Sequence, residues 1–105
     1  MDYEIVWTEP ATEALQEITT YIAQNAPSAA RRVADDILER VELLKTVPLI
    51  GAAYPRGAQG STTRVVVCGK YRIFYRVIEG LKRVEILTVW HSSRREPDLP
   101  SDASA

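Results

Sequence analysis

A chain of 105 residues, 46% hydrophobic and 26% charged, is long enough for one domain around one core, and this balance excludes wholesale disorder. No apolar run approaches the roughly 18 residues that a membrane span needs, and the first residues do not open a signal peptide. A single cysteine (Cys68) and a single histidine (His91) exclude an internal disulfide and a structural zinc site. We therefore expect a cytoplasmic protein with no metal and no cofactor.

The net charge of −1 hides an asymmetry between the two halves of the chain. Residues 1–53 hold nine acidic and four basic side chains, a net charge of −5, whereas residues 54–105 hold five acidic and nine basic ones, a net charge of +4. Either the exposed surfaces of helices and strands differ in composition, or a basic face is aimed at an anionic partner. The isoelectric point near 5.8 is low for a domain that binds nucleic acid nonspecifically.

The first predicted elements are a strand and a helix. Residues 3–7 alternate and are rich in β-forming residues, which predicts a strand. Thr8 offers a hydroxyl N-cap, and Pro10 suits a first helical turn because its missing N–H would be unpaired there. Apolar residues then recur at helical spacing to about Gln24.

A second helix is predicted from 25–28 to about Thr46, with Asn25 or Ser28 as its cap. The short connection makes the two helices an antiparallel hairpin. Residues 49–63, with several glycines and prolines, predict an irregular connection that is longer than most.

The second half of the chain predicts three antiparallel strands. Their ranges are 63–68, 71–78 and 83–90. Gly69 and Lys70 have a two-residue hairpin signature, and Glu79–Gly80 form the second turn. Residues 96–105 are turn-rich and polar, so we expect a flexible tail after a single domain that spans residues 1–95.

Alternation along the strand over 71–78 predicts two faces. One face, which should bury against the helices, carries Ile73, Tyr75 and Val77. The other, which should stay accessible, carries Arg72, Phe74 and Arg76. The predicted fold is α+β: an N-terminal strand, an antiparallel helical hairpin, then a three-stranded antiparallel meander, with the hairpin on one face of a mostly antiparallel sheet.

This order of elements resembles the RelE/ParE family of bacterial toxins, the toxin halves of type II toxin–antitoxin pairs that are often labelled plasmid-stabilisation proteins. The resemblance covers about residues 3–95. It rests on LKTVPLIG at 44–51, Arg64, YRIFYRV at 71–77 and ILTVWHSSR at 86–94.

Two activities follow from this resemblance. RelE-like toxins are ribosome-dependent ribonucleases that cut mRNA, and ParE-like toxins bind DNA gyrase and stall it. Cleavage through the RNA 2′-hydroxyl needs proton transfer and cations for the phosphorane charge, for which the candidates are His91, Arg64 and Arg76. Nuclease-branch toxins usually carry a denser lysine and arginine set and often a tyrosine near the C-terminus, whereas here nothing aromatic follows Trp90.

We therefore favour the ParE branch, with the ribonuclease as the alternative and a non-toxic member that only binds its partner as a second alternative. Each candidate residue also has an ordinary structural explanation, such as a cross-strand partner in Glu79 or Glu85 for an arginine. The resemblance implies a cognate antitoxin that covers the toxin with an extended or helical segment, in a hetero-oligomer. The candidate target-binding residues are Arg64, Arg72, Arg76, His91, Arg94 and Arg95.

Overall fold

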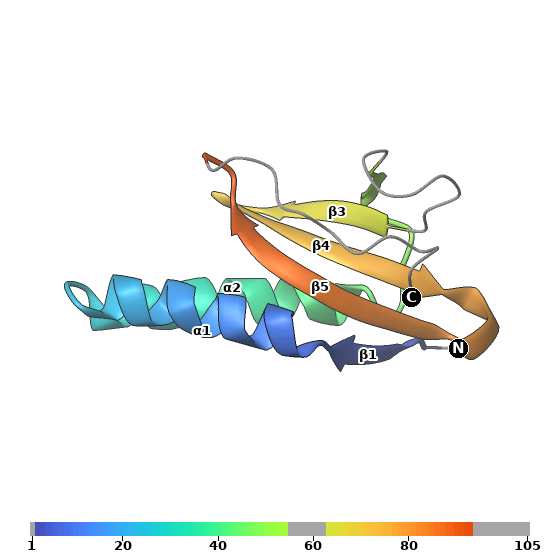
Figure 1. The fold of residues 1–105 in the computed structure, drawn as a ribbon, viewed down its shortest axis with the longest axis horizontal. Helices are drawn as coiled ribbons and strands as arrows, with labels where there is room; N and C mark the ends of the chain where they lie inside the picture. The colour runs from blue at the N-terminus through green and yellow to red at the C-terminus, as the bar shows by residue number, and fades with distance from the viewer. Residues whose placement is uncertain (1, 55–62, 94–105) are drawn as a thin grey trace.

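The computed structural model describes residues 2–54 and 63–93. Its elements, in chain order, are β1 (Glu4–Trp7), α1 (Glu9–Ala23), α2 (Pro27–Leu43), β2 (Ala52–Ala53), β3 (Thr63–Cys68), β4 (Tyr71–Ile78), a short 3-10 turn (Glu79–Leu81) and β5 (Arg83–His91). Figure 1 shows two layers, with α1 and α2 side by side against one face of a twisted sheet. The predicted α+β architecture is confirmed.

The sheet has five strands in the order β1-β5-β4-β3-β2. The meander of β3, β4 and β5 is antiparallel, as predicted, but β1 lies parallel to β5 at one edge. The two-residue strand β2 pairs with β3 at the other edge, inside the segment that was predicted to be irregular. Two residues are too few for an alternating pattern, so the sequence held no signal for β2.

The first helix begins as predicted. The Thr8 hydroxyl accepts a hydrogen bond from the Ala11 amide at 3.4 Å, and Pro10 stands in the first turn. The same hydroxyl donates to the Ile86 carbonyl at 2.6 Å, which ties the junction of β1 and α1 to β5.

The predicted cap of the second helix is wrong. The N-cap is Ala26, which makes no side-chain capping bond, rather than Asn25 or Ser28. Pro27 occupies the first helical position, where its fixed φ starts the helix, so the residue before it becomes the cap whatever its side chain.

The main core lies between the helices and one sheet face. Ile73, Tyr75 and Val77 of β4 are buried in it, as predicted. Its other buried members are Ala11, Ile37, Val41, Leu44, Val66, Cys68, Val84, Ile86 and Val89.

The opposite sheet face departs from the prediction. Phe74 is fully buried there, in a second apolar cluster with Tyr54 and Leu87, and only the two arginines beside it keep partial exposure. A face of an antiparallel sheet need not be wholly open, because a few aromatic residues on neighbouring strands can bury one another.

A β-bulge in β5 determines toward which face of the sheet the last side chains of this strand point. Phe74 pairs with Thr88 but Tyr75 pairs with Ile86, so Leu87 is an extra residue. A bulge of one residue reverses the alternation beyond it. Side chains from position 88 onward therefore face the opposite way from what simple alternation along β5 would give.

Candidate functional site

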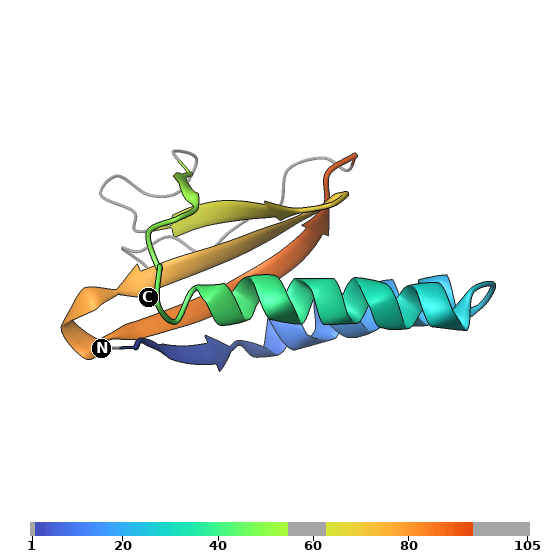
Figure 2. The same cartoon turned by 180° about the vertical axis from the view of Figure 1, so that it is seen from behind.

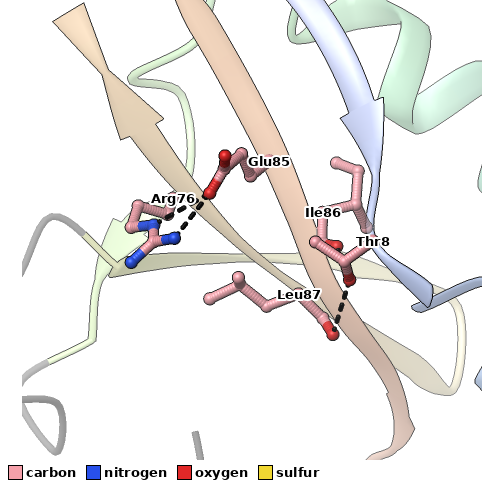
Figure 3. A network of polar contacts seen from close by, with 5 residues as sticks. All are labelled: Thr8, Arg76, Glu85, Ile86 and Leu87. Atoms are coloured by element: carbon pink, nitrogen blue, oxygen red, sulfur yellow. Dashed lines mark hydrogen bonds and ion pairs between the residues drawn. The ribbon is translucent and has the colours of Figure 1, made fainter. Parts of the chain in front are cut away.

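Arg76 lies on the sheet face away from the helices and is paired with an acid. Its Nη2 and Nε atoms donate to Glu85 Oε1 at 2.6 and 3.1 Å (Figure 3). The register places the two residues opposite each other on β4 and β5, and their side chains are 18% and 17% exposed. The carboxylate compensates much of the charge that Arg76 could offer to a phosphate.

Arg72 stands on the same face, beside the second apolar cluster. Its guanidinium carbon lies 5.5 Å from the centre of the Phe74 ring, and Tyr54 meets that ring edge-on at 4.9 Å. Its Nε is buried and has no hydrogen-bond partner among the described residues. Trp90 is its neighbour across the strands. We call Arg72, Phe74, Tyr54 and Trp90 the aromatic shelf, a combination of arginine and aromatic side chains that is enriched in binding interfaces.

Arg64 is engaged by the segment that leads into β2. Its Nη1 donates to the Gly51 carbonyl at 2.7 Å and to the Leu49 carbonyl at 3.3 Å. Tyr75 supports the same segment: its hydroxyl donates to the Pro48 carbonyl at 2.8 Å and accepts from the Gly51 amide at 2.9 Å. Burial raises the pKa of this phenol. Arg64 therefore positions a loop.

His91 lies at the far end of the sheet. It pairs across the strands with Tyr71, and the two rings meet edge-on at 5.3 Å. Its Nδ1 is 2.6 Å from the Ser93 hydroxyl and accepts from the Ser93 amide at 3.2 Å. Because of the extra residue in β5, its ring faces the helix side of the sheet.

There His91 lines a groove of about 610 Å³ between α1 and the ends of β4 and β5. The α1 wall includes Tyr21, which is 75% exposed, and Glu17. The groove's other lining residues are Ala14, Ile18, Ile22, Tyr71, Val89 and Trp90. Figure 2 shows the distal part of the helical hairpin extending past the end of the sheet.

The three candidates for RNA cleavage do not come together. On β4, the partner of His91 is Tyr71, five residues from Arg76, which is about 17 Å along a strand. Arg76 also lies on the opposite face of the sheet, because it alternates with Tyr75 and Val77 of the main core. Groups that share one phosphate must lie within about 3 Å of its atoms, which these residues cannot do together in this arrangement.

Arg94 and Arg95 lie outside the described residues. Within residues 2–54 and 63–93 no group of three or more His, Cys, Asp or Glu side chains is placed to hold a metal ion. Neither described helix is long and apolar enough to span a bilayer.

Arg72 and His91 were predicted as target-binding candidates, but the aromatic side chains of the shelf and the α1 wall of the groove were not predicted as parts of a site. Tyr54 belongs to a segment without hydrophobic periodicity. In the sequence, Tyr21 cannot be distinguished from the other exposed residues of an amphipathic helix. The only signal available was the presence of aromatic residues at positions that the helical and strand patterns leave outside the core.

A hairpin of helices against a meander, with two arginines on the outer sheet face, defines a small α+β domain, and comparison with known proteins identifies its family. Residues 5–96 match the family described as ParE toxin of the type II toxin–antitoxin system parDE. Y4kP of Sinorhizobium fredii is 36% identical over 97 residues, 90% of this chain and 94% of that protein. Toxin RelE2 of Caulobacter vibrioides is 34% identical over 91 residues, 87% of this chain and 97% of that protein.

Solved structures agree on the fold. The chromosomal ParDE TA system from P. aeruginosa superposes with a TM-score of 0.70 at 24% identity, over 85% of this chain and 95% of that one. The toxin–antitoxin complex RelBE2 from Mycobacterium tuberculosis gives a TM-score of 0.64 at 24% identity, over 87% and 99%. This chain belongs to the RelE/ParE family of type II toxins.

Proposed function

We propose that this chain arrests bacterial growth by binding DNA gyrase in the cytoplasm, as ParE-like toxins do, and that it has no RNA-cleaving centre. The observation that carries the proposal is the separation of the cleavage candidates. His91 faces the groove at one end of the sheet, whereas Arg76 is paired with Glu85 on the other face. Arg64 holds backbone carbonyls of its own chain.

Arg72 and Trp90, the half-buried members of the aromatic shelf, are the surface that we assign to the target. The Arg72 guanidinium lies over the ring of the buried Phe74, 5.5 Å from its centre. Arginine and aromatic side chains at the centre of an interface contribute a large share of binding energy. Arg94 and Arg95 follow β5 in the sequence after two serines and stay candidates for the same contact.

An antitoxin neutralises this toxin and forms a hetero-oligomer with it. The groove between α1 and the ends of β4 and β5 is apolar along Ile18, Ile22 and Val89, which suits the apolar stripe of an amphipathic segment. The similarity to the ParDE and RelBE2 systems supports such a partner. A role in plasmid stabilisation would follow from the pair.

The alternative function is a ribosome-dependent ribonuclease. It is favoured by one specific finding, the 34% identity to a protein named toxin RelE2. In that case His91, Arg64 and Arg76 would need a ribosome-induced rearrangement to act on one phosphate.

The test is to induce the wild-type chain and three variants in a bacterial host and to follow growth, mRNA integrity and plasmid supercoiling together. The variants are Arg72→Ala, His91→Ala and a matched control, Arg31→Ala, which removes an exposed arginine from α2. We expect arrest with intact mRNA and altered supercoiling for the wild type, His91→Ala and Arg31→Ala. Arg72→Ala should lose the arrest, and purified protein should inhibit gyrase supercoiling only when Arg72 is present.

Codon-phased mRNA cleavage that disappears in His91→Ala would overturn this proposal and establish the ribonuclease. A wild-type chain that leaves growth unchanged would assign the protein to the non-toxic, partner-binding members of the family.

A further inference from the structure

The segment that follows α2 passes from one face of the sheet to the other. We call residues 48–54 the strap. It begins on the helix side, where the Pro48 carbonyl and the Gly51 amide bond to the hydroxyl of Tyr75 in the main core. It ends at Tyr54, which belongs to the second apolar cluster on the opposite face. Figure 2 shows the chain rising from the end of α2 to β2 at the edge of the sheet.

Arg64 holds the strap from the helix side. Along β3 it alternates with Val65, so its side chain shares a face with Val66 of the main core. Its Nη1 atom donates to the Gly51 and Leu49 carbonyls at 2.7 and 3.3 Å, and its backbone pairs with Ala53 of β2. The strap also has little room to shift, because a Cβ atom at Gly51 would lie 2.7 Å from the Val65 carbonyl oxygen.

The end of the strap lies beneath the surface that we assign to the target. The Tyr54 amide donates to the Thr63 carbonyl at 3.0 Å, and its ring meets the Phe74 ring edge-on at 4.9 Å. The Arg72 guanidinium lies over the same Phe74 ring, and Trp90 packs against the same cluster. Tyr54 is only 8% exposed, so it supports this surface from below.

We propose that Arg64 is a positioning residue for target binding. It fixes the strap, and the strap fixes Tyr54 and Phe74 beneath the two side chains that meet the target. The inference rests on the proposed function, because it concerns the same target surface. A surface that is already held in its binding conformation loses less conformational freedom when the target binds, which raises affinity. Arg64 can therefore control target binding from the other face of the sheet, without touching the target.

The hydrogen bonds of Arg64 are tested with Arg64→Met and its matched control Arg64→Lys. Both side chains have an unbranched apolar stem, but only lysine can donate to the two carbonyls, which a single nitrogen atom holds in the wild type. We expect Arg64→Met to inhibit gyrase supercoiling about tenfold more weakly than the wild type, and Arg64→Lys to stay within about twofold. Ile37→Val, in the main core on α2, lowers global stability and should leave inhibition unchanged.

A second variant releases the strap from its other anchor. Tyr75→Phe removes the bonds to Pro48 and Gly51 without changing any charge, so it should weaken gyrase inhibition as Arg64→Met does. The result therefore does not depend on the folding of one variant.

A double-mutant cycle tests whether Arg64 acts through Tyr54. Combining Arg64→Met with Tyr54→Ala should weaken inhibition no more than Tyr54→Ala alone, because the strap then has no ring left to position. If the two losses multiply instead, Arg64 contacts the target itself and the positioning role is refuted.

Hydrogen exchange measures the strap without any target. In Arg64→Met the amides of Gly51 and Tyr54, which bond to the Tyr75 hydroxyl and the Thr63 carbonyl, should exchange about tenfold faster than in the wild type. Amides in the ladder between β4 and β5 should keep their rates.

Unchanged exchange at residues 51 and 54, or wild-type inhibition by Arg64→Met, would overturn the inference and leave the proposed function intact. Inhibition by Arg64→Lys as weak as that by Arg64→Met would also overturn it, because lysine restores the donor. A wild-type chain that does not inhibit gyrase would contradict the proposed function and the inference together.

Discussion

Replacing Tyr75 with phenylalanine should destabilise the protein, because the change removes the hydrogen-bond partner of two backbone groups. The phenolic hydroxyl donates to the Pro48 carbonyl at 2.8 Å and accepts from the Gly51 amide at 2.9 Å. Tyr75 and Gly51 are both buried, so the amide loses its partner in a place that water does not reach. An unsatisfied buried group costs about 1–3 kcal/mol, and we expect about 2 kcal/mol here because the half-buried Pro48 carbonyl can bond to water.

For a chain of this length, an unfolding entropy of about 2.1 cal/mol/K per residue converts that loss into a decrease of about 9 °C in Tm. Urea unfolding followed by circular dichroism measures the free energy, and thermal melts measure Tm. Tyr21→Phe is the control, because Tyr21 is 75% exposed and should change stability by less than about 0.5 kcal/mol. If Tyr75→Phe is as stable as the wild type within about 0.5 kcal/mol, the Gly51 amide must reach water or another acceptor when the hydroxyl is removed.

Three further predictions concern stability. Gly51→Ala should cost at least about 2 kcal/mol in chemical denaturation, because its new Cβ would lie 2.5 Å from the phenolic oxygen, whereas Gly80→Ala meets nothing within 4 Å and should be nearly neutral. Glu85→Gln should cost about 1 kcal/mol by the same measurement because it leaves a half-buried arginine without its carboxylate, whereas Glu4→Gln, at a pair whose acid is 63% exposed, should change little. Burial raises the pKa of the Cys68 thiol above its ordinary value of 9.0. As the pH rises, the unfolded state therefore loses this proton before the folded state does, and the free energy of unfolding should fall above pH 9.0. Cys68→Ala should reduce this dependence on pH, and an unchanged dependence would contradict the assignment to Cys68.

Much of the fold could be predicted because local signals were strong. The ranges of β3 and β4 match the sequence prediction, since the two-residue turn at Gly69 and Lys70 fixes where one strand stops and the next starts. Thr8 identified the start of α1 in the same way. The parallel pairing of β1 with β5 could not be read locally, because it joins segments almost 80 residues apart in the sequence.

The candidate site was harder to predict, because it depends on single residues that depart from the hydrophobic periodicity of the helices and strands. Glu85 was named in advance as an ordinary partner for an arginine, and it does pair with Arg76. The direction of His91 depends on the bulge at Leu87, and nothing in an uninterrupted run of strand-forming residues marks which residue is extra. Arg64 looked like a free cation, yet its acceptors are two backbone carbonyls in a segment without regular pattern.

The parallel pairing of the first strand with the last also has a consequence for biosynthesis. Glu4 lies opposite Arg83, so β1 has no sheet to join until most of the chain has been translated. At about 5–20 residues per second, that wait lasts on the order of 4–16 s. During this wait α1 leaves exposed the apolar stripe that it later buries against β5. The newly made chain can therefore complete this fold only after β5 has been synthesised, which leaves an interval in which a binding protein can reach surfaces that the finished fold conceals.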